Sequence, residues 1–356
     1  MACLMVLYSH LPATGYLPKT SVNFGGLGVM LFFVLSGFLM GYLYLEKTKL
    51  PDLVSYAVKR FFRVYPLYFI ASLALFCVVA TIGIEELPGS RLQLPTYNFD
   101  YLIKQLTLEK GFGGFWTIPV EMHFYVLFAL IMLISLKHWP IRFIAIFAAT
   151  LVAFASYSLP ATAHEWVILI KYNSYAVMWD FMGIFLCGAY FGAIYRKWPD
   201  GGYLQLIISK LSNLITIIIF VCFIVASNIL FYWQEFPVVS WGNSMVISLL
   251  LSFYVLTCAV SSSAPSQLIN NRFLRFTGKI SFSLYILHIF TFSLIVNNYL
   301  LAPWIGIPLL IISSYVCAIL SYQYIEKPGI RIGQHFNDYL LCCIEKQNIA
   351  VHKINS

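Results

Sequence analysis

Long apolar runs, separated by short polar stretches, make up most of this chain. A helix needs roughly 20 apolar residues to cross the hydrocarbon core of a bilayer, whereas the strands of a membrane barrel would alternate. The pattern therefore predicts an all-α, polytopic integral membrane bundle of about ten transmembrane helices. The predicted spans are residues 1–11, 26–45, 64–83, 116–136, 141–158, 174–195, 211–231, 241–260, 279–297 and 303–324.

The two ends of the chain depart from this pattern. Residues 1–11 are too short to span a bilayer and lack the basic start of a signal peptide. We expect them to be the second half of a truncated first helix, with its first half encoded upstream. No linker rich in proline, glycine or serine divides the chain, so we expect one membrane domain, 1–330, and a cytoplasmic tail, 331–356.

The charged residues predict the orientation of the bundle. Only 10% of residues are charged, against about 25% in soluble domains, and 60% are apolar. Of the 22 lysines and arginines, 17 lie in alternate loops and in the tail, which should face the cytoplasm. The net charge of +8 is then a topology signal, and it gives no reason to expect nucleic-acid binding. The cytoplasmic loops of this scheme are 46–63, 137–142, 196–210 and 261–279.

Familiar motifs for nucleotide, zinc and serine-nucleophile chemistry are missing from the sequence. The eight cysteines show no metal-ligand spacing with histidine, and we expect them to act mainly as small, buried apolar side chains. We therefore expect no metal site and no tightly bound cofactor. Polar groups inside the apolar runs are the remaining candidates, because polar side chains at membrane depth are costly and commonly functional.

A histidine and a carboxylate fall at similar predicted depths near the outer surface. His10 ends the first run, and Glu121 lies about one turn into the run that begins near Trp116. A carboxylate can orient an imidazole and raise its basicity, so we predict that the two side chains pair as catalytic residues. The alternatives are an interfacial histidine and a helix-packing hydrogen bond of Glu121.

Two arginines mark the opposite, cytoplasmic surface. Arg60 and Arg63 are three residues apart and share a helix face, which suits phosphate groups. A lipid-headgroup anchor is the alternative. Nearby, Ser36 and Gly37 offer small side chains in the middle of a span, where a neighbouring helix or a thin ligand could approach closely.

A polar stripe follows one face of the run 279–297. Ser281, Tyr285 and His288 are spaced four and three residues apart on an otherwise apolar helix. His288 would lie near mid-membrane. A packing histidine explains this stripe as well as a functional one does.

Five motifs in order resemble those of the acyltransferase-3 family, bacterial membrane acyltransferases that modify envelope and secreted carbohydrates. The resemblance covers nearly the whole chain. The matching motifs are Phe33-Val34-Leu35-Ser36-Gly37-Phe38, Arg60-Phe61-Phe62-Arg63-Val64-Tyr65-Pro66, Phe115-Trp116-Thr117-Ile118-Pro119-Val120-Glu121-Met122-His123-Phe124-Tyr125, Gly278-Lys279-Ile280-Ser281-Phe282-Ser283-Leu284-Tyr285-Ile286-Leu287-His288, and Tyr324-Ile325-Glu326-Lys327-Pro328.

The resemblance implies an acyltransferase of the stand-alone type, located in the bacterial inner membrane with a cytoplasmic C-terminus. Acetyl-coenzyme A or a similar acyl-coenzyme A would be the donor, and a carbohydrate hydroxyl, free or lipid-linked, the acceptor. It implies that His10 is the essential first-helix histidine and that Arg60 and Arg63 serve the donor. The matched motifs also make Trp116 and Tyr125 candidates. The family's first-helix arginine, about three turns before the histidine, would fall before Met1.

We therefore expect a membrane O-acyltransferase in which the donor threads from Arg60 and Arg63 past Ser36 and Gly37 to His10. One alternative is a carrier, such as a glycan-lipid flippase or a proton-coupled transporter, which would use the same buried groups as a proton relay. Another is an inactive member that keeps only the scaffold. Consumption of the thioester distinguishes the enzyme from the carrier.

Overall fold

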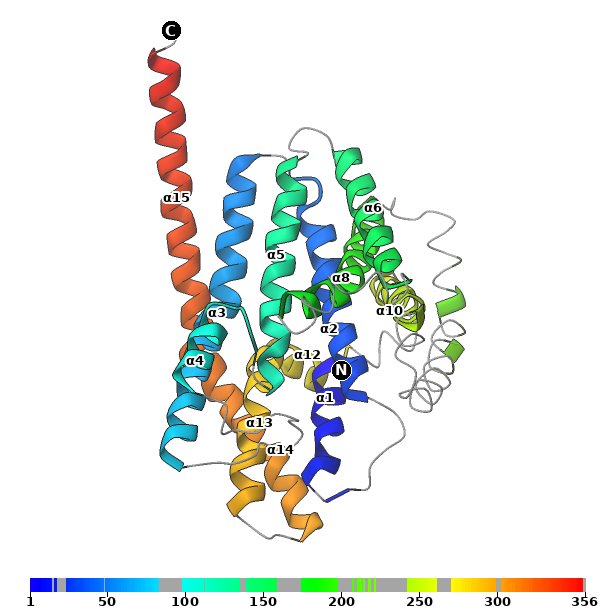
Figure 1. The fold of residues 1–356 in the computed structure, drawn as a ribbon. Coiled ribbons are helices and arrows are strands. Elements are labelled where there is room, and N and C mark those ends of the chain that lie inside the picture. The colour runs from blue at the N-terminus through cyan, green and yellow to red at the C-terminus, as the bar shows by residue number, and fades with distance from the viewer. Residues whose placement is uncertain are drawn as a thin grey trace.

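The chain folds as a bundle of helices in the computed structural model shown in Figure 1. Every regular element among the described residues is helical, which confirms the predicted all-α class. The predicted span 211–231 lies largely outside those residues. The structure describes residues 1–14, 16–17, 24–47, 49–82, 98–111, 113–134, 139–158, 174–197, 242–260, 270–298 and 302–354, with a few residues between 207 and 221.

Most helices begin and end within about four residues of the predicted positions. The α-helices are α1 (Ala2–His10), α2 (Phe24–Tyr44), α3 (Leu50–Ile82), α4 (Phe99–Leu106), α5 (Thr117–Ile134), α6 (Trp139–Ser158), α8 (Ser174–Lys197), α10 (Gly242–Val260), α12 (Arg272–Lys279), α13 (Ser281–Asn298), α14 (Pro303–Ser321) and α15 (Lys327–Ile354). Short turns of 3-10 helix lie at η1 (Leu11–Thr14) and η3 (Gly113–Trp116), and a π-helix, η5, at Tyr322–Glu326.

Four of the described helical segments are long and apolar enough to cross a membrane: Phe24–Tyr44, Leu50–Ala80, Gly114–Leu133 and Pro303–Gln347. The faces of these helices that point away from the bundle are apolar, like the faces that point into it. Val126 and Leu130 on α5 are about half exposed. Apolar side chains on the outside of an apolar helix suit contact with lipid tails, so the chain is a polytopic membrane protein.

The largest difference from the sequence-based expectation concerns residues 46–63. This stretch was expected to be a loop, yet α3 begins at Leu50 and runs unbroken through both arginines and past Pro66. Pro51 and Asp52 favour the helix start, because proline fits the first turn and an acidic group complements the helix dipole there. Arg60 and Arg63 therefore stand on a rigid helix.

The C-terminal tail is also helical. Figure 1 shows α15 lying beside α3 and extending past the end of the bundle. The close approach depends on two glycines, because an added Cβ would lie 3.2 Å from Pro66 at Gly329 and 2.4 Å from Phe62 at Gly333. The domain boundary predicted at residue 330 falls inside this helix.

Helices α2 and α8 form the tightest seam in the described bundle. A Cβ added at Gly37 would lie 1.9 Å from the carbonyl oxygen of Phe185, and the matching distance at Gly188 to Val34 is 2.2 Å. Glycines four residues apart on each helix let the backbones touch, as is common between membrane helices. Gly37 lies against Phe185, and Gly41, four residues later, lies against Ala189, so α2 and α8 run parallel. The predicted alternation of spans requires this direction.

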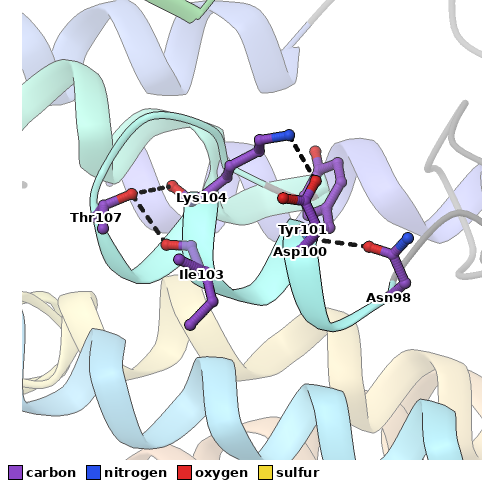
Figure 2. A network of polar contacts seen from close by, with 6 residues as sticks. All are labelled: Asn98, Asp100, Tyr101, Ile103, Lys104 and Thr107. Atoms are coloured by element: carbon purple, nitrogen blue, oxygen red, sulfur yellow. Dashed lines mark hydrogen bonds and ion pairs between the residues drawn. The ribbon is translucent and has the colours of Figure 1, made fainter.

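Helix α4 is short and amphipathic, and Figure 2 shows hydrogen bonds and an ion pair between near neighbours on its surface. The Asn98 side chain caps the helix by accepting a hydrogen bond from the Tyr101 backbone N–H at 2.9 Å. Lys104 pairs with Asp100 one turn earlier, at 2.5 Å. The Gln105 side chain instead points inward, where it donates a hydrogen bond of 2.7 Å to Ser72 Oγ and fixes α4 against α3.

Candidate active site

A cavity of about 350 Å³ opens among helices α1, α2, α3, α5, α12 and α13. Most of its wall is apolar, and the bundle around it is densely aromatic. Such a space is in the range of small-molecule pockets, which pair apolar walls with a few placed polar groups. The polar residues of the lining are Ser36, Arg60, Arg63, Thr117, Glu121, Tyr125, Thr277, Ser281 and Tyr285.

Ser36 and Gly37 are neighbours in sequence but have opposite roles. Ser36 lines the cavity with Val29, Phe32 and Phe33, which recur at helical spacing on one face of α2. Gly37 belongs to the other face, where it lies against the α8 backbone. Ser36 thus lines the cavity, whereas Gly37 lies in the helix seam.

A carboxylate and two hydroxyls meet at the centre of the cavity wall. The Tyr125 hydroxyl donates a short hydrogen bond to Glu121 Oε1 from one turn further along α5. Ser36 Oγ also donates to Glu121 Oε1, at 3.1 Å, and lies 3.1 Å from the Tyr125 hydroxyl. Charge-assisted hydrogen bonds of this kind are stronger than neutral ones, so they hold Glu121 in a single orientation.

Arg60 reaches the same cluster from α3. Its guanidinium lies 5.7 Å from the Tyr125 ring centre and 5.9 Å from that of Tyr44, distances typical of cation–π contacts. Among the described residues, no carboxylate lies within ion-pair distance of Arg60. Its Nε is buried without a hydrogen-bond acceptor. Arg60 is therefore a cation at the cavity wall whose charge no described carboxylate balances.

Arg63 is different because it already has an anionic partner. Its Nη1 lies 3.2 Å from Oε1 of Glu326, whose side chain is fully buried at the π-helix η5. Ser283 Oγ donates to the other carboxylate oxygen at 2.8 Å. Sequence reasoning missed this pair, although Glu326 stood in a quoted motif as a lone acidic residue at the end of an apolar span. Arg63 ties α3 to the C-terminal helices as well as lining the cavity.

His10 lies apart from the cavity, and its neighbour is His288. The two ring centres are 5.2 Å apart. Two turns earlier, Cys3 Sγ donates to the carbonyl of Ser281 at 3.5 Å, and both Cys3 and Ser281 line the cavity. Helices α1 and α13 therefore run parallel and in register. Seven residues of helix put His10 about 10 Å beyond the cavity wall along α1.

The predicted pair of His10 and Glu121 is not formed in this structure. Both residues are among those described, and they share no hydrogen bond or ion pair, because Glu121 bonds instead to Ser36 and Tyr125. The physical reason is depth. Glu121 lies level with the start of α1, whereas His10 ends that helix. Charge-derived topology orders residues along a span only coarsely, so it did not separate these two levels.

Tyr285 connects the cavity with the histidines. Its hydroxyl accepts a hydrogen bond from Thr117 Oγ1 at 3.1 Å, and its ring centre is 6.0 Å from that of His288. Ser281 also lines the cavity, and its hydroxyl donates to the Gly278 carbonyl at 2.9 Å. The predicted polar stripe thus begins at the cavity with Ser281 and Tyr285 and ends at His288, which faces His10.

Trp116 has a packing position. Its ring centre lies 6.2 Å from that of Phe33 on α2 and 5.1 Å from that of Phe181 on α8. It does not belong to the cavity lining. Among the described residues, no group of three histidine, cysteine or acidic side chains is placed to hold a metal ion.

Comparisons with known proteins find relatives named as O-acetyltransferases. The chain is 27% identical over 331 residues to the O-acetyltransferase OatA of Staphylococcus aureus strain COL, covering 85% of this chain and 52% of that protein. It is 24% identical over 346 residues to a protein named Putative O-acetyltransferase SACOL0978 in the same strain, covering 89% of this chain and 55% of the relative. The chain thus spans about half the length of these relatives. No solved structure matches it.

The family comparison covers nearly all of the bundle. The model of the acyltransferase domain, Acyl_transf_3, matches residues 1–323, which include the cavity, the histidine pair and the π-helix up to its second residue. The chain therefore belongs to the acyltransferase-3 family.

Proposed function

We propose that this protein is a membrane O-acyltransferase that moves an acetyl or similar acyl group from acyl-coenzyme A to a hydroxyl of a cell-envelope or secreted carbohydrate. The observation that carries the proposal is the cavity itself. It joins the cation of Arg60, with no carboxylate in ion-pair distance among the described residues, to the hydroxyls of Ser36 and Tyr125 inside an apolar wall. The names of the relatives as O-acetyltransferases support the reaction class.

The donor would enter by its thioester end. The cavity of about 350 Å³ suits a slender arm better than a whole nucleotide. Phosphates left at the mouth would meet Arg60, because a planar guanidinium binds phosphate oxygens with charge-assisted hydrogen bonds. Arg60 and Arg63 would then face the cytoplasm, as the basic loops predict, in a bacterial inner membrane with a cytoplasmic C-terminus.

The acceptor would come from the opposite surface, where α1 ends at His10. His10 would remove the proton of the attacking hydroxyl as a new carbon–oxygen bond forms at the thioester carbonyl. The carbon–sulfur bond then breaks, and the proton passes to the departing thiolate. General-base help of this kind is typically worth ~10²–10⁴ in rate. Glu121, held by Ser36 and Tyr125, would line the path of the donor arm through the cavity, about two helical turns before the thioester reaches His10.

The test compares Arg60→Ala with its sequence neighbour Lys59→Ala. Lys59 is equally basic, but it is exposed and does not line the cavity. In membrane vesicles, thiol release from acetyl-coenzyme A and acetyl transfer to an envelope-glycan preparation are measured together. Arg60→Ala should raise the donor KM about 10- to 100-fold, because hydrogen bonds to charged groups contribute ~1.5–3 kcal/mol.

Lys59→Ala should leave the donor KM unchanged, and Arg60→Lys should restore only part of the loss, since it keeps the charge and loses the planar fork. Equal effects of the two alanine variants would refute the assignment of Arg60. If purified protein moves glycan across vesicles without consuming thioester, the protein is a carrier and the proposal is wrong.

A further inference from the structure

His288 is held in a single tautomer by the backbone of its own helix. Its Nδ1 lies 2.7 Å from the carbonyl oxygen of Tyr285 and 3.2 Å from that of Leu284. Carbonyl oxygens only accept hydrogen bonds, so Nδ1 carries the hydrogen of the neutral ring. The other nitrogen, Nε2, is then a bare acceptor whose direction is set by α13.

That bare nitrogen has no partner of its own. His288 is only 1% exposed, and its Nε2 is buried without a hydrogen-bond donor. An unsatisfied buried acceptor costs roughly 1–3 kcal/mol, so a packing role alone would favour an apolar side chain here. The ring centres nearest to His288 are those of His10 at 5.2 Å, Phe292 at 5.8 Å and Tyr285 at 6.0 Å. Phe292 has no donor, and the Tyr285 hydroxyl lies on the cavity side beside Thr117, so the ring N–H of His10 is the donor best placed for Nε2.

We propose that His288 is a positioning residue for His10. Its Nε2 accepts a hydrogen bond from one water, which in turn accepts one from the His10 ring, and this leaves the other nitrogen of His10 bare for the proton of the acceptor hydroxyl. The parallel, in-register packing of α1 and α13 keeps the two rings at the same level. The inference rests on the proposed function, since it assigns His288 to the same proton transfer.

Two substitutions separate positioning from packing. His288→Phe keeps a ring of similar size and removes the acceptor, whereas His288→Gln places an amide oxygen near the position of Nε2. We expect His288→Phe to lower turnover about 10- to 100-fold, with the donor KM unchanged. Its thermal midpoint should stay level or rise, because an unsatisfied polar atom is replaced by apolar surface. His288→Gln should recover at least a third of the lost factor on a logarithmic scale.

The matched control is Thr291→Val on the same helix. Thr291 is also buried, but its hydroxyl bonds to the His288 carbonyl at 2.9 Å and to Ser314 at 2.6 Å, away from the His10 ring. This variant should leave turnover unchanged. Because His288 acts through His10, the double variant His10→Ala, His288→Phe should be no slower than His10→Ala alone.

The outcomes that overturn the inference are distinct from those that overturn the proposed function. A loss of stability in His288→Phe would make His288 a packing residue. The positioning role would also be refuted if His288→Phe kept full turnover, or if His288→Phe and His288→Gln turned over equally slowly. It would be refuted as well if the double variant lost the product of the two single losses. If His10→Ala itself keeps full turnover, the proposed role of His10 fails first, and with it the role of His288.

Discussion

The two faces of α2 show how one membrane helix can serve assembly and chemistry at once. On one face, Gly37 and Gly41 bring the backbone of α8 so close that an added Cβ would lie 1.9 Å and 2.0 Å from its carbonyl oxygens. On the other face, Ser36 opens onto the cavity and bonds to Glu121. Adjacent residues thus belong to different functions, because successive positions on a helix point about 100° apart.

The difference between the faces lies in what each can tolerate. The seam between α2 and α8 has no space left, so any larger side chain there should disrupt it, whether that side chain is polar or apolar. The cavity has space but depends on a few directed hydrogen bonds, so it is sensitive to polarity. Substitutions on the two faces should therefore fail in different assays.

The largest effect is expected at the centre of the seam. Gly37→Leu should abolish the folded state, because the new side chain meets backbone atoms of Phe185, which cannot rotate away. The cost should exceed the ~1–3 kcal/mol typical of an overfilled side-chain core. Thermal midpoint and monodisperse yield in detergent are the measurements. Leu43→Phe adds bulk on the same helix at an exposed position and should change neither; a stable, monodisperse Gly37→Leu would contradict the seam.

An intermediate effect is expected on the cavity face. Ser36→Ala should lower turnover about 10- to 100-fold, since a hydrogen bond to a charged group is worth ~1.5–3 kcal/mol, while the fold stays intact. Thiol release and thermal midpoint are measured on the same preparation. Ser313→Ala on α14 is the control, because that hydroxyl only donates to the Leu310 carbonyl of its own helix. Loss of stability without loss of turnover would show that Ser36 belongs to packing.

The smallest effect is expected where the seam ends. Glu46 follows α2 and pairs with Lys197 and, at 3.2 Å, with Arg196 at the end of α8. The hydrogen bond from Lys197, together with that from Arg196, lowers the pKa of Glu46 below its ordinary value of 4.5. Its contribution is therefore present above pH 4.5 and disappears as the pH falls through the lowered pKa.

Glu46→Gln should cost only about 0.2–1 kcal/mol near neutral pH, as is usual for exposed pairs, and nothing in strong acid. Denaturation of both proteins between pH 3 and 7 measures the difference, and added salt should shrink it. If the difference in unfolding free energy between the two proteins grew as the pH fell, it would have the wrong sign for an ion pair. Glu46 would then not stabilise the end of the seam through its charge.

The positions of the helices were the most predictable from sequence, because apolar run length placed most of them. The cap of α4 by Asn98 and the pair of Asp100 and Lys104 follow local spacings of three and four residues, but the apolar runs did not predict α4 itself. The cavity lining was predicted only in part. Arg60 and Ser36 were expected on one path, whereas Glu121 was expected near the outer surface and instead joins them in the cavity.

Contacts between distant segments were not predictable. The pair of Arg63 and Glu326 joins residues far apart in the chain, and no local pattern connects them. The predicted contact between His10 and Glu121 is not formed, because depth along a span was known only coarsely, whereas the register of α1 against α13 brings His10 beside His288. The stretch 46–63 was expected to be a loop on account of its charges, yet it is helical from Leu50, where Pro51 and Asp52 favour a helix start.

The π-helix η5 determines which face of the following helix, α15, is buried. Buried positions step by three or four residues along α14, at Gly306, Leu310, Ser314, Ala318 and Ser321, and by three or four again at Gly329, Gly333 and Asn337. Between Ser321 and Glu326 the step is five, because a π-turn holds one residue more than an α-turn. If the same residues formed an α-turn instead, Ile325, four positions after Ser321, would take the buried position and the rest of the helix would be turned by about 100°. Arg63 would then lose its partner without any change at either charged residue, so the length of this turn is as much a part of the ion pair as the two side chains are.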